Sequence, residues 1–298
     1  MTTAVDIPRG LVVTRPRPRA EGWAGAFQRL RKNRLSVVGS IIVTLLVIVA
    51  VSAPVLGLTD PIKLNVVKRF TPPGPGHWFG TDHLGRDVLS RVLHGARFSL
   101  LIGALTILSA GIPGVLVGVL AATAPARLSA AIMRGMDLLM SFPPLLLAIA
   151  VAAALGTGGR SIVIALSVVY FPRIARVTRS VALSVVAQEY VLAAFALGAS
   201  GWRLIGRTVL PNCLSVVIVQ CSLYFAEVLL AEAALSFLGL GEAPPHPTWG
   251  SMLYDAQKNM RTAPWIAIFP GAAIAVSVLG LNLFGDAVRD AMDPRMRT

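Results

Sequence analysis

The chain has 298 residues, of which 55% are hydrophobic and only 14% are charged, and its mean hydropathy is +0.72. A soluble domain of this length would carry about a quarter charged residues. The composition therefore favours one polytopic membrane domain over two soluble domains. A net charge of +13 would suggest nucleic-acid binding in a soluble protein, but in a membrane protein it indicates basic loops facing anionic lipid.

The N-terminal segment 1–34 is basic and is followed by an uncharged run. It holds eight Lys/Arg residues, and Leu35–Gly57 then continues for 23 residues without a charge. The apolar core of a cleavable signal is shorter, about 7–15 residues. We therefore expect a basic cytoplasmic tail over 1–34 and an uncleaved transmembrane helix over 35–57.

Several further segments are long and apolar enough to cross a bilayer, which requires about 20 residues. With the first span they are Leu35–Gly57, Phe98–Thr123, Leu138–Leu155, Cys213–Leu238 and Ala263–Phe284. A sixth candidate, Arg160–Val186, would be the fourth span in chain order. It carries Arg173, Arg176 and Arg179 near one helix face. Such a helix can span if its arginines reach one headgroup layer.

The distribution of basic residues decides the number and direction of the spans. With six spans and both termini in the cytoplasm, the inside segments hold 18 Lys/Arg and the outside segments nine. Without the fourth span the counts become 12 inside and 15 outside. The positive-inside rule therefore predicts an all-α protein with six spans, a transmembrane core over 98–285 that includes the cytoplasmic segment 187–212, and a cytoplasmic tail over 286–298.

The outer segment 58–97 begins with a Pro/Gly-rich loop and continues as DVLSRVLHGARFSL. Its apolar residues fall near helical spacing, so we expect a short amphipathic helix on the outer surface before the second span. Asp82, Arg86 and Asp87 form its charged motif, either as a salt-bridged cap or as a contact with a partner. The spacing of the histidines is not that of metal ligands, and no metal site is predicted (His77, His83, His94 and His246).

The cytoplasmic segment 187–212 combines an Ala/Leu-rich helix, a glycine turn at Gly198, and a short basic helix. Pro211 suits the first turn of the next helix. An ordinary loop, a DNA-binding helix-turn-helix and a docking helix all have this outline. The flanking spans leave little room for a DNA-binding domain, so we expect no nucleic-acid partner.

The stretch EYVLAAFALGASGWRLIGRTVLPN resembles the coupling loop of ABC-importer permeases. The family pattern is Glu-Ala-Ala, three residues, Gly, nine residues, Ile, any residue, Leu-Pro. This sequence departs from it at Leu192 and Thr208, where the family has glutamate and isoleucine. The resemblance implies an ATPase-coupling loop that contains Glu189, Ala193, Ala194, Phe195, Gly198, Ala199, Ser200, Trp202, Arg203, Leu210 and Pro211.

Four other stretches resemble the second, C-type permease of the dipeptide/oligopeptide/nickel subfamily, and the likeness runs from about Asn33 to Arg295. They are FGTDHLGRDVLSRVLHGARFSL, MDLLMSFPPLLLAI, EAALSFLGLGEAPPHPTWG and NLFGDAVRDAMDPR. The resemblance implies the type I importer fold, half of a pore for di- or oligopeptides, and a prokaryotic cell membrane. Nickel and glutathione are the alternative substrates.

The same resemblance implies the partners. They are a homologous second permease, two ABC ATPase subunits or domains that bind ATP and Mg, and an extracytoplasmic binding protein. The motif at Asp82, Arg86 and Asp87 is the candidate contact for that binding protein.

Two carboxylates and a proline pair stand inside predicted spans. Intramembrane carboxylates are functional candidates because their burial in lipid is costly. Glu227 is expected to line the pathway or to pair with the second permease, and Glu232 to line the pathway or to be solvated or paired. Phe142 and Pro143 interrupt the third span, as a pathway feature or a packing kink. Asp137 is expected to pair with Arg134 beside it.

The sequence contains no GxxxxGK[ST] phosphate loop, so we expect no ATPase site and no cofactor in this chain. A membrane-embedded enzyme is the rival class. It would need a nucleophile with a base, or metal ligands, facing each other in the bilayer, and no such set stands out. A passive channel or ion-coupled transporter would have no use for a docking loop.

Overall fold

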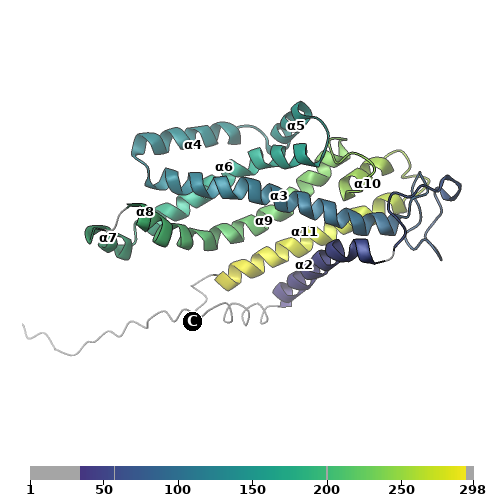
Figure 1. Cartoon of the computed structure of the whole chain (residues 1–298), viewed down its shortest axis with the longest axis horizontal. Coiled ribbons are helices and arrows are strands. Elements are labelled where there is room, and N and C mark those ends of the chain that lie inside the picture. Colours follow the sequence, from purple (N-terminus) through teal and green to yellow (C-terminus); the bar gives the residue numbers. More distant parts are fainter. Residues whose placement is uncertain (1–33, 57, 199–200, 293–298) are drawn as a thin grey trace, which may run out of the picture.

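The computed structural model describes residues 34–56, 58–198 and 201–292 (Figure 1). The tail 1–33, Gly57, Ala199, Ser200 and residues 293–298 lie outside the described residues. Over the described ranges the chain is helical, without strands and with two isolated bridges. Its α-helices are α2 (Arg34–Ser52), α3 (Val88–Thr123), α4 (Ala126–Met140), α5 (Pro144–Leu155), α6 (Gly159–Val186), α7 (Glu189–Ala196), α8 (Gly201–Leu204), α9 (Leu210–Phe237), α10 (Trp249–Ala256) and α11 (Trp265–Met292).

Within the described residues, five helical segments are long and apolar enough to cross a membrane. They contain α2, α3, α6, α9 and α11, and the pair α4–α5 is a sixth span if its bent halves are counted together. The all-α, multi-span class predicted from the sequence is therefore confirmed. The predicted fourth span, in spite of its arginines, forms the continuous helix α6.

The predicted third span, Leu138–Leu155, is wrong as a single helix. The structure has α4 and α5 there, with an 86° bend between them. Pro143 precedes α5 and Pro144 opens it, and a proline there has no amide donor with which to continue the ladder of α4. The twelve residues of α5 are about 18 Å long, so α5 crosses a bilayer only together with α4.

The predicted separate surface helix before the second span is also wrong, because it is the first part of α3. Asp87 caps this 36-residue helix and accepts a hydrogen bond from the Ser90 amide at 2.8 Å. Val88 and Val92 pack in a core cluster with residues of α10 and α11. The apolar face that suggested a surface helix is therefore buried against the protein.

Helices α3 and α6 approach each other closely through the glycines of a GxxxG motif. A Cβ atom on Gly114 would lie 2.9 Å from Ile174 Cγ2, and one on Gly118 would lie 2.5 Å from the carbonyl oxygen of Ala175. Small residues at this spacing let two membrane helices pack backbone to backbone. Helix α6 is accordingly the most deeply buried of the five long spans.

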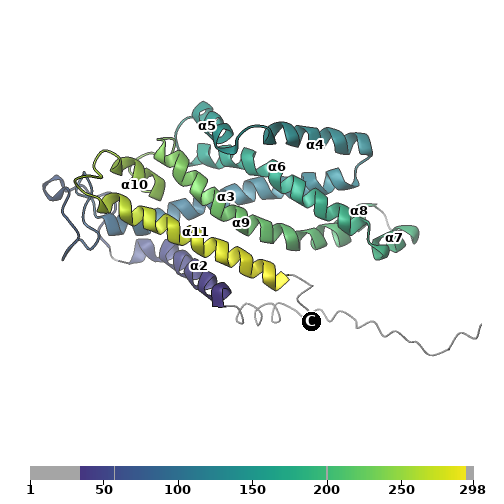
Figure 2. The same ribbon diagram turned by 180° about the vertical axis from the view of Figure 1, so that it is seen from behind.

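The long helices run side by side, with α2 along one edge of the bundle and α4 along the other (Figures 1 and 2). The segment that precedes α3 and the short helix α10 lie together at one end, which we call the α10 end. Helices α7 and α8 lie at the opposite end, which we call the α7 end. The predicted outer segment Leu58–Arg97 and the segment Gly239–Thr262, which contains α10, are thus at the same end of the molecule.

Candidate functional site

The α7 end carries a helical hairpin that projects from the bundle (Figure 1). Helix α7 ends before Gly198, which adopts a φ of +85°. This left-handed conformation favours glycine, because a side chain there would be strained. The chain then continues as α8, the π-helical segment Ile205–Val209 and α9, which together form one 37-residue helical span.

This continuity corrects the boundary predicted for the fifth span at Cys213. Pro211 does lie in the first turn of α9, but no break separates that turn from α8. The π segment closes with a hydrogen bond from the Leu210 amide to the Ile205 carbonyl. A widened turn of this kind accommodates a proline that would clash inside a regular helix. Trp202 and Arg203 therefore belong to the same rod as the fifth span.

The hairpin leaves large apolar side chains uncovered. Leu197 is 89% exposed and Trp202 is 82% exposed, with Tyr190 and Leu192 more than half exposed, whereas Val191 of α7 is buried. Among the predicted coupling residues, the exposed ones are Glu189, Ala193, Gly198, Trp202, Arg203 and Pro211, and the half-buried ones are Ala194 and Leu210. Phe195 lies in α7. Several large exposed apolar side chains on neighbouring short helices are typical of a docking site.

The α10 end holds a buried network of charges. Arg86 donates to Asp82 at 2.6 Å and to Asp255 at 3.1 Å, and Arg91 lies 3.6 and 3.8 Å from the same two carboxylates. Asp82 also accepts from the backbone amides of Leu84 and Arg86. Asp87 stands apart from this network and binds His77 at 2.9 Å. The salt-bridged cap predicted from the sequence is therefore present, although the sequence did not reveal Asp255 as its partner.

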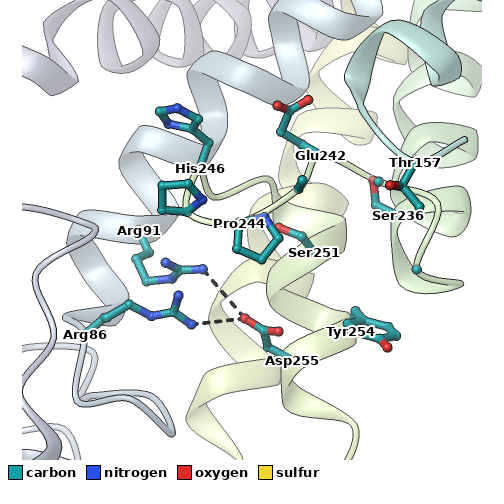
Figure 3. Close-up of a pocket in the computed structure, with 14 residues that line it drawn as sticks. Arg86, Arg91, Thr157, Ser236, Glu242, Pro244, His246, Ser251, Tyr254 and Asp255 are labelled. Carbon is teal, nitrogen blue, oxygen red and sulfur yellow. Dashed lines mark hydrogen bonds and ion pairs between the residues drawn. The ribbon is translucent and has the colours of Figure 1, made fainter.

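A pocket of about 170 Å³ opens beside this network (Figure 3). Figure 3 shows Arg86 and Arg91 both directed at Asp255 across its wall. Glu242, also on the wall, accepts a hydrogen bond from the Gly159 amide at 2.7 Å. This bond ties the segment before α10 to the first turn of α6, and the sequence alone gave no indication of it.

Glu227 forms an ion pair halfway along the bundle. Its Oε2 atom lies 3.1 Å from Arg173 Nη1 and accepts a hydrogen bond from the Tyr170 hydroxyl at 3.5 Å. The Glu227 side chain is nevertheless 53% exposed. The expected alternatives were the pathway and a residue of the second permease, whereas the structure pairs Glu227 with an arginine of its own chain.

Glu232 is 0% exposed, so in this conformation it lines no surface. Of the alternatives expected for Glu232, the structure shows a paired carboxylate that is neither solvated nor open to a pathway. Its Oε1 accepts from the Ser236 hydroxyl at 2.9 Å, and its Oε2 has no partner within the described residues. The sequence could not indicate this burial, which arises because α3 and α10 close over this part of α9.

Two further arginines of α6 contact α4. Arg176 pairs with Asp137, and Arg179 donates to the Ser129 hydroxyl at 3.3 Å. The predicted pair between Asp137 and Arg134 is therefore replaced by a pair that joins two helices. Phe142 and Pro143 are both exposed at the bend between α4 and α5. Within the part of the chain that the structure describes, no group of three metal-ligating side chains comes together.

Comparison with known proteins identifies the family. The model of the binding-protein-dependent transport system inner membrane component matches residues 114–298. The chain belongs to this family. A second model, of the N-terminal membrane domain of oligopeptide transport permease C, matches residues 22–73 of the permease. The resemblance to C-type permeases is thereby confirmed.

Curated relatives of the permease align along almost its whole length. A dipeptide transport permease protein of Alkalihalophilus pseudofirmus is 41% identical over 93% of this chain and 91% of the relative. A di/tripeptide permease of Pseudomonas aeruginosa is 42% identical over 95% and 94%. A glutathione permease of Pectobacterium atrosepticum is 37% identical over 97% and 96%. The protein is thus a multi-pass inner-membrane transport permease of a prokaryote.

Proposed function

We propose that this permease forms half of the translocation pathway of an ATP-driven importer for di- or oligopeptides. The observation that carries the proposal is the hairpin at the α7 end, which presents uncovered apolar side chains on a rod continuous with α9. The names of the relatives support peptides as the substrate class. Glutathione, itself a peptide, is the alternative within the family, followed by a nickel chelate.

The complex contains two ABC ATPase subunits or domains, which bind ATP and Mg, and the hairpin lies in a groove of an ATPase. The permease itself has no ATPase site, in keeping with the lack of a phosphate loop in its sequence. A homologous second permease completes the pathway, and an extracytoplasmic binding protein delivers the substrate at the α10 end. The Lys/Arg distribution supports this direction, with both termini and the α7 end in the cytoplasm.

The geometry suggests how ATP binding reaches the pathway. A displacement of α8 is passed to α9 along one helical rod, while Gly198 lets α7 keep its own orientation in the ATPase groove. The ATPases shift the population between outward- and inward-facing states only if their contacts with the hairpin differ between the two states. Closure of the ATPase dimer supplies that difference.

Membrane-enzyme chemistry has no comparable support. The buried charges at the α10 end pair with one another, and no three metal-ligating side chains converge within the described residues. A passive channel would not require the exposed hairpin. We therefore retain the transport function alone.

Two glycines of the hairpin provide a matched test. Gly198 has a φ of +85°, whereas Gly201 opens a regular helix, and a Cβ atom at either position would meet nothing within 4 Å. Gly198→Val should therefore act through backbone strain alone. In proteoliposomes containing the whole complex we expect it to lower ATP-driven peptide uptake more than about tenfold, with membrane insertion intact.

Gly201→Val is the control and should retain near-normal uptake. Wild-type rates in Gly198→Val would contradict the assignment of the hairpin. A cysteine at Leu197 should cross-link to an ATPase subunit, and cross-linking to the binding protein instead would reverse the proposed direction of the bundle.

A further inference from the structure

A polar patch lies halfway along the bundle, where α6 and α9 run next to each other (Figure 2). The mid-bundle patch consists of Tyr170 and Arg173 from α6 and Gln220, Tyr224 and Glu227 from α9. The three α9 residues recur at intervals of four and three, which places them on one helix face. The rings of Tyr170 and Tyr224 lie 5.6 Å apart and join the two helices across the patch.

An ion pair forms the centre of the mid-bundle patch. Arg173 and Glu227 are 3.1 Å apart, with 25% and 53% of their side chains exposed. The Arg173 guanidinium also lies 5.2 Å from the centre of the Tyr170 ring, within the range of a cation–π contact. Each charge is compensated by its neighbour, yet both remain open to an approaching molecule.

The charges of the patch limit what its exposed side can contact. Arg173 stands in the middle of the 28-residue helix α6, about 20 Å from either end, and is the first of the three arginines assigned to the cytoplasmic side. Charged side chains are costly in hydrocarbon and face protein, a water-filled cavity or, for a long arginine, a headgroup layer. Because Arg173 is paired with Glu227 of α9, we assign the exposed side of this ion pair to another subunit or to a pathway.

The outer surface of α2 is apolar, in contrast to the mid-bundle patch. Its exposed side chains include Leu35, Ile41, Leu45, Ile48 and Val51, and it forms the edge of the bundle beyond α11 (Figures 1 and 2). An apolar surface of this kind is suited to lipid. The contrast assigns α2 to the lipid side and the mid-bundle patch to the interior of the transporter.

We propose that the mid-bundle patch is a transient binding site for the charged termini of the peptide during its passage. This inference rests on the proposed transport function. A peptide at neutral pH carries both a carboxylate and an ammonium group. Arg173 binds the carboxylate and Glu227 binds the ammonium, so that one internal ion pair is exchanged for two with the substrate. The half-buried Tyr224 can offer its hydroxyl to the amide group between the termini, while the buried Tyr170 donates to Glu227 and holds it in place.

The internal pair also explains how such a site releases its ligand. When the pathway is empty, neither charge is left unpaired in the membrane, where an isolated charge would be strongly unfavourable. When the peptide is bound, the re-forming pair between Arg173 and Glu227 competes with it. The site therefore holds a zwitterion without trapping it.

The test compares peptides that differ in a single terminus. The complete complex is reconstituted in proteoliposomes with saturating binding protein, and ATP-driven uptake is measured for alanyl-alanine and for its C-terminal amide. The affinity of the binding protein for each peptide is measured separately, so that its own preference can be removed from the ratio. We expect the wild-type complex to transport the free acid at least about tenfold faster than the amide.

Arg173→Gln should abolish this preference, so that the free acid and the amide are transported at equal rates. The wild-type complex should likewise transport alanyl-alanine faster than its N-acetyl derivative, which lacks the ammonium group. Glu227→Gln should abolish that second preference. Arg176→Gln is the matched control, because Arg176 lies one turn further along α6 and pairs with Asp137 of α4. Its preference for the free acid should equal that of the wild type.

Equal losses for the free acid and the amide in Arg173→Gln would overturn the proposal, as would an unchanged rate for both. Loss of the second permease on copurification of this variant would also overturn it, because the pair would then belong to the contact between the permeases. Failure of the transport function itself would look different, since the wild-type complex would then import neither peptide with ATP.

Discussion

The two ends of the helix bundle differ in which side chains they bury and which they expose. At the α10 end, charged residues are buried, and Arg86 and Arg91 share the carboxylates of Asp82 and Asp255. At the α7 end, apolar residues are exposed, as with Leu197 and Trp202. The α10 end thus pairs the charges of this network with one another, whereas the α7 end leaves apolar surface exposed, as is typical of a docking site.

The largest expected effect comes from breaking the charge network. Arg86→Ala leaves two carboxylates with only the more distant Arg91, and breaking a buried ion pair from one side costs about 3–5 kcal/mol of folding free energy. We expect a marked fall in yield and in the melting midpoint of the detergent-purified permease. Lys63→Ala, at an exposed position in the same outer segment, should change neither. An unaltered midpoint in Arg86→Ala would show that the α10 end is not stabilised by its charges.

The second prediction concerns the exposed hairpin. Leu197→Ala removes a side chain that is 89% exposed, so the stability of the permease alone should not change. Binding of the ATPase subunits should weaken about tenfold, or by about 1.4 kcal/mol. Copurification and ATPase titration measure this effect. Ile112→Ala, an exposed truncation midway along α3, serves as the control and should bind the ATPases normally.

A smaller change tests the departure from the family pattern at Leu192. This residue is exposed on α7, one turn after Glu189, where the resemblance implies a glutamate. Leu192→Glu should strengthen ATPase binding by about 0.2–1 kcal/mol, as expected for a solvent-exposed ion pair. The gain should disappear at high salt. If Leu192→Gln produced the same gain, the effect would not be electrostatic.

The smallest expected effect comes from neutralising one acidic residue at the α10 end, and the same change at the α7 end serves as the comparison. Glu242→Gln keeps an acceptor for the Gly159 amide but removes the charge near the start of α6, which is worth about 0.3–1 kcal/mol. Glu189→Gln makes the same change in the exposed first turn of α7. We expect a slight fall in the melting midpoint of the isolated permease for Glu242→Gln only. Equal shifts would mean that burial at the α10 end adds nothing to this interaction.

The sequence predicted the helices of the fold better than the bends and boundaries between them. Long apolar runs and the Lys/Arg bias predicted the helical, multi-span class, and α6 was recovered in spite of its arginines. Bends and boundaries were predicted wrongly where a local sequence pattern is compatible with two structures. Pro143 and Pro144 signalled an interruption but not an 86° bend, and the apolar face at Val88 fitted a surface helix as well as the buried start of α3.

For the candidate sites, the sequence predicted which residues matter more reliably than their partners. Glu227 was predicted to be a functional candidate, but its pairing with Arg173 was not predicted. Asp137 was predicted to pair with Arg134 and pairs instead with Arg176. These partners are distant in the chain and meet only because α6 packs between α4 and α9. Sequence spacing carries no information about such contacts unless both residues lie on one helix.

The sequence by itself determined that this chain is a membrane protein, where its apolar helices lie, and which segment resembles a coupling loop. These properties depend on composition and on neighbours within a few turns, which a single chain displays directly. Only the tertiary structure decided that Glu232 is enclosed while Glu227 is open, and that Arg86 is shared between Asp82 and Asp255. Burial and ion pairing are properties of helices packed together, and the close approach of α3 to α6 through Gly114 and Gly118 helps to set that packing.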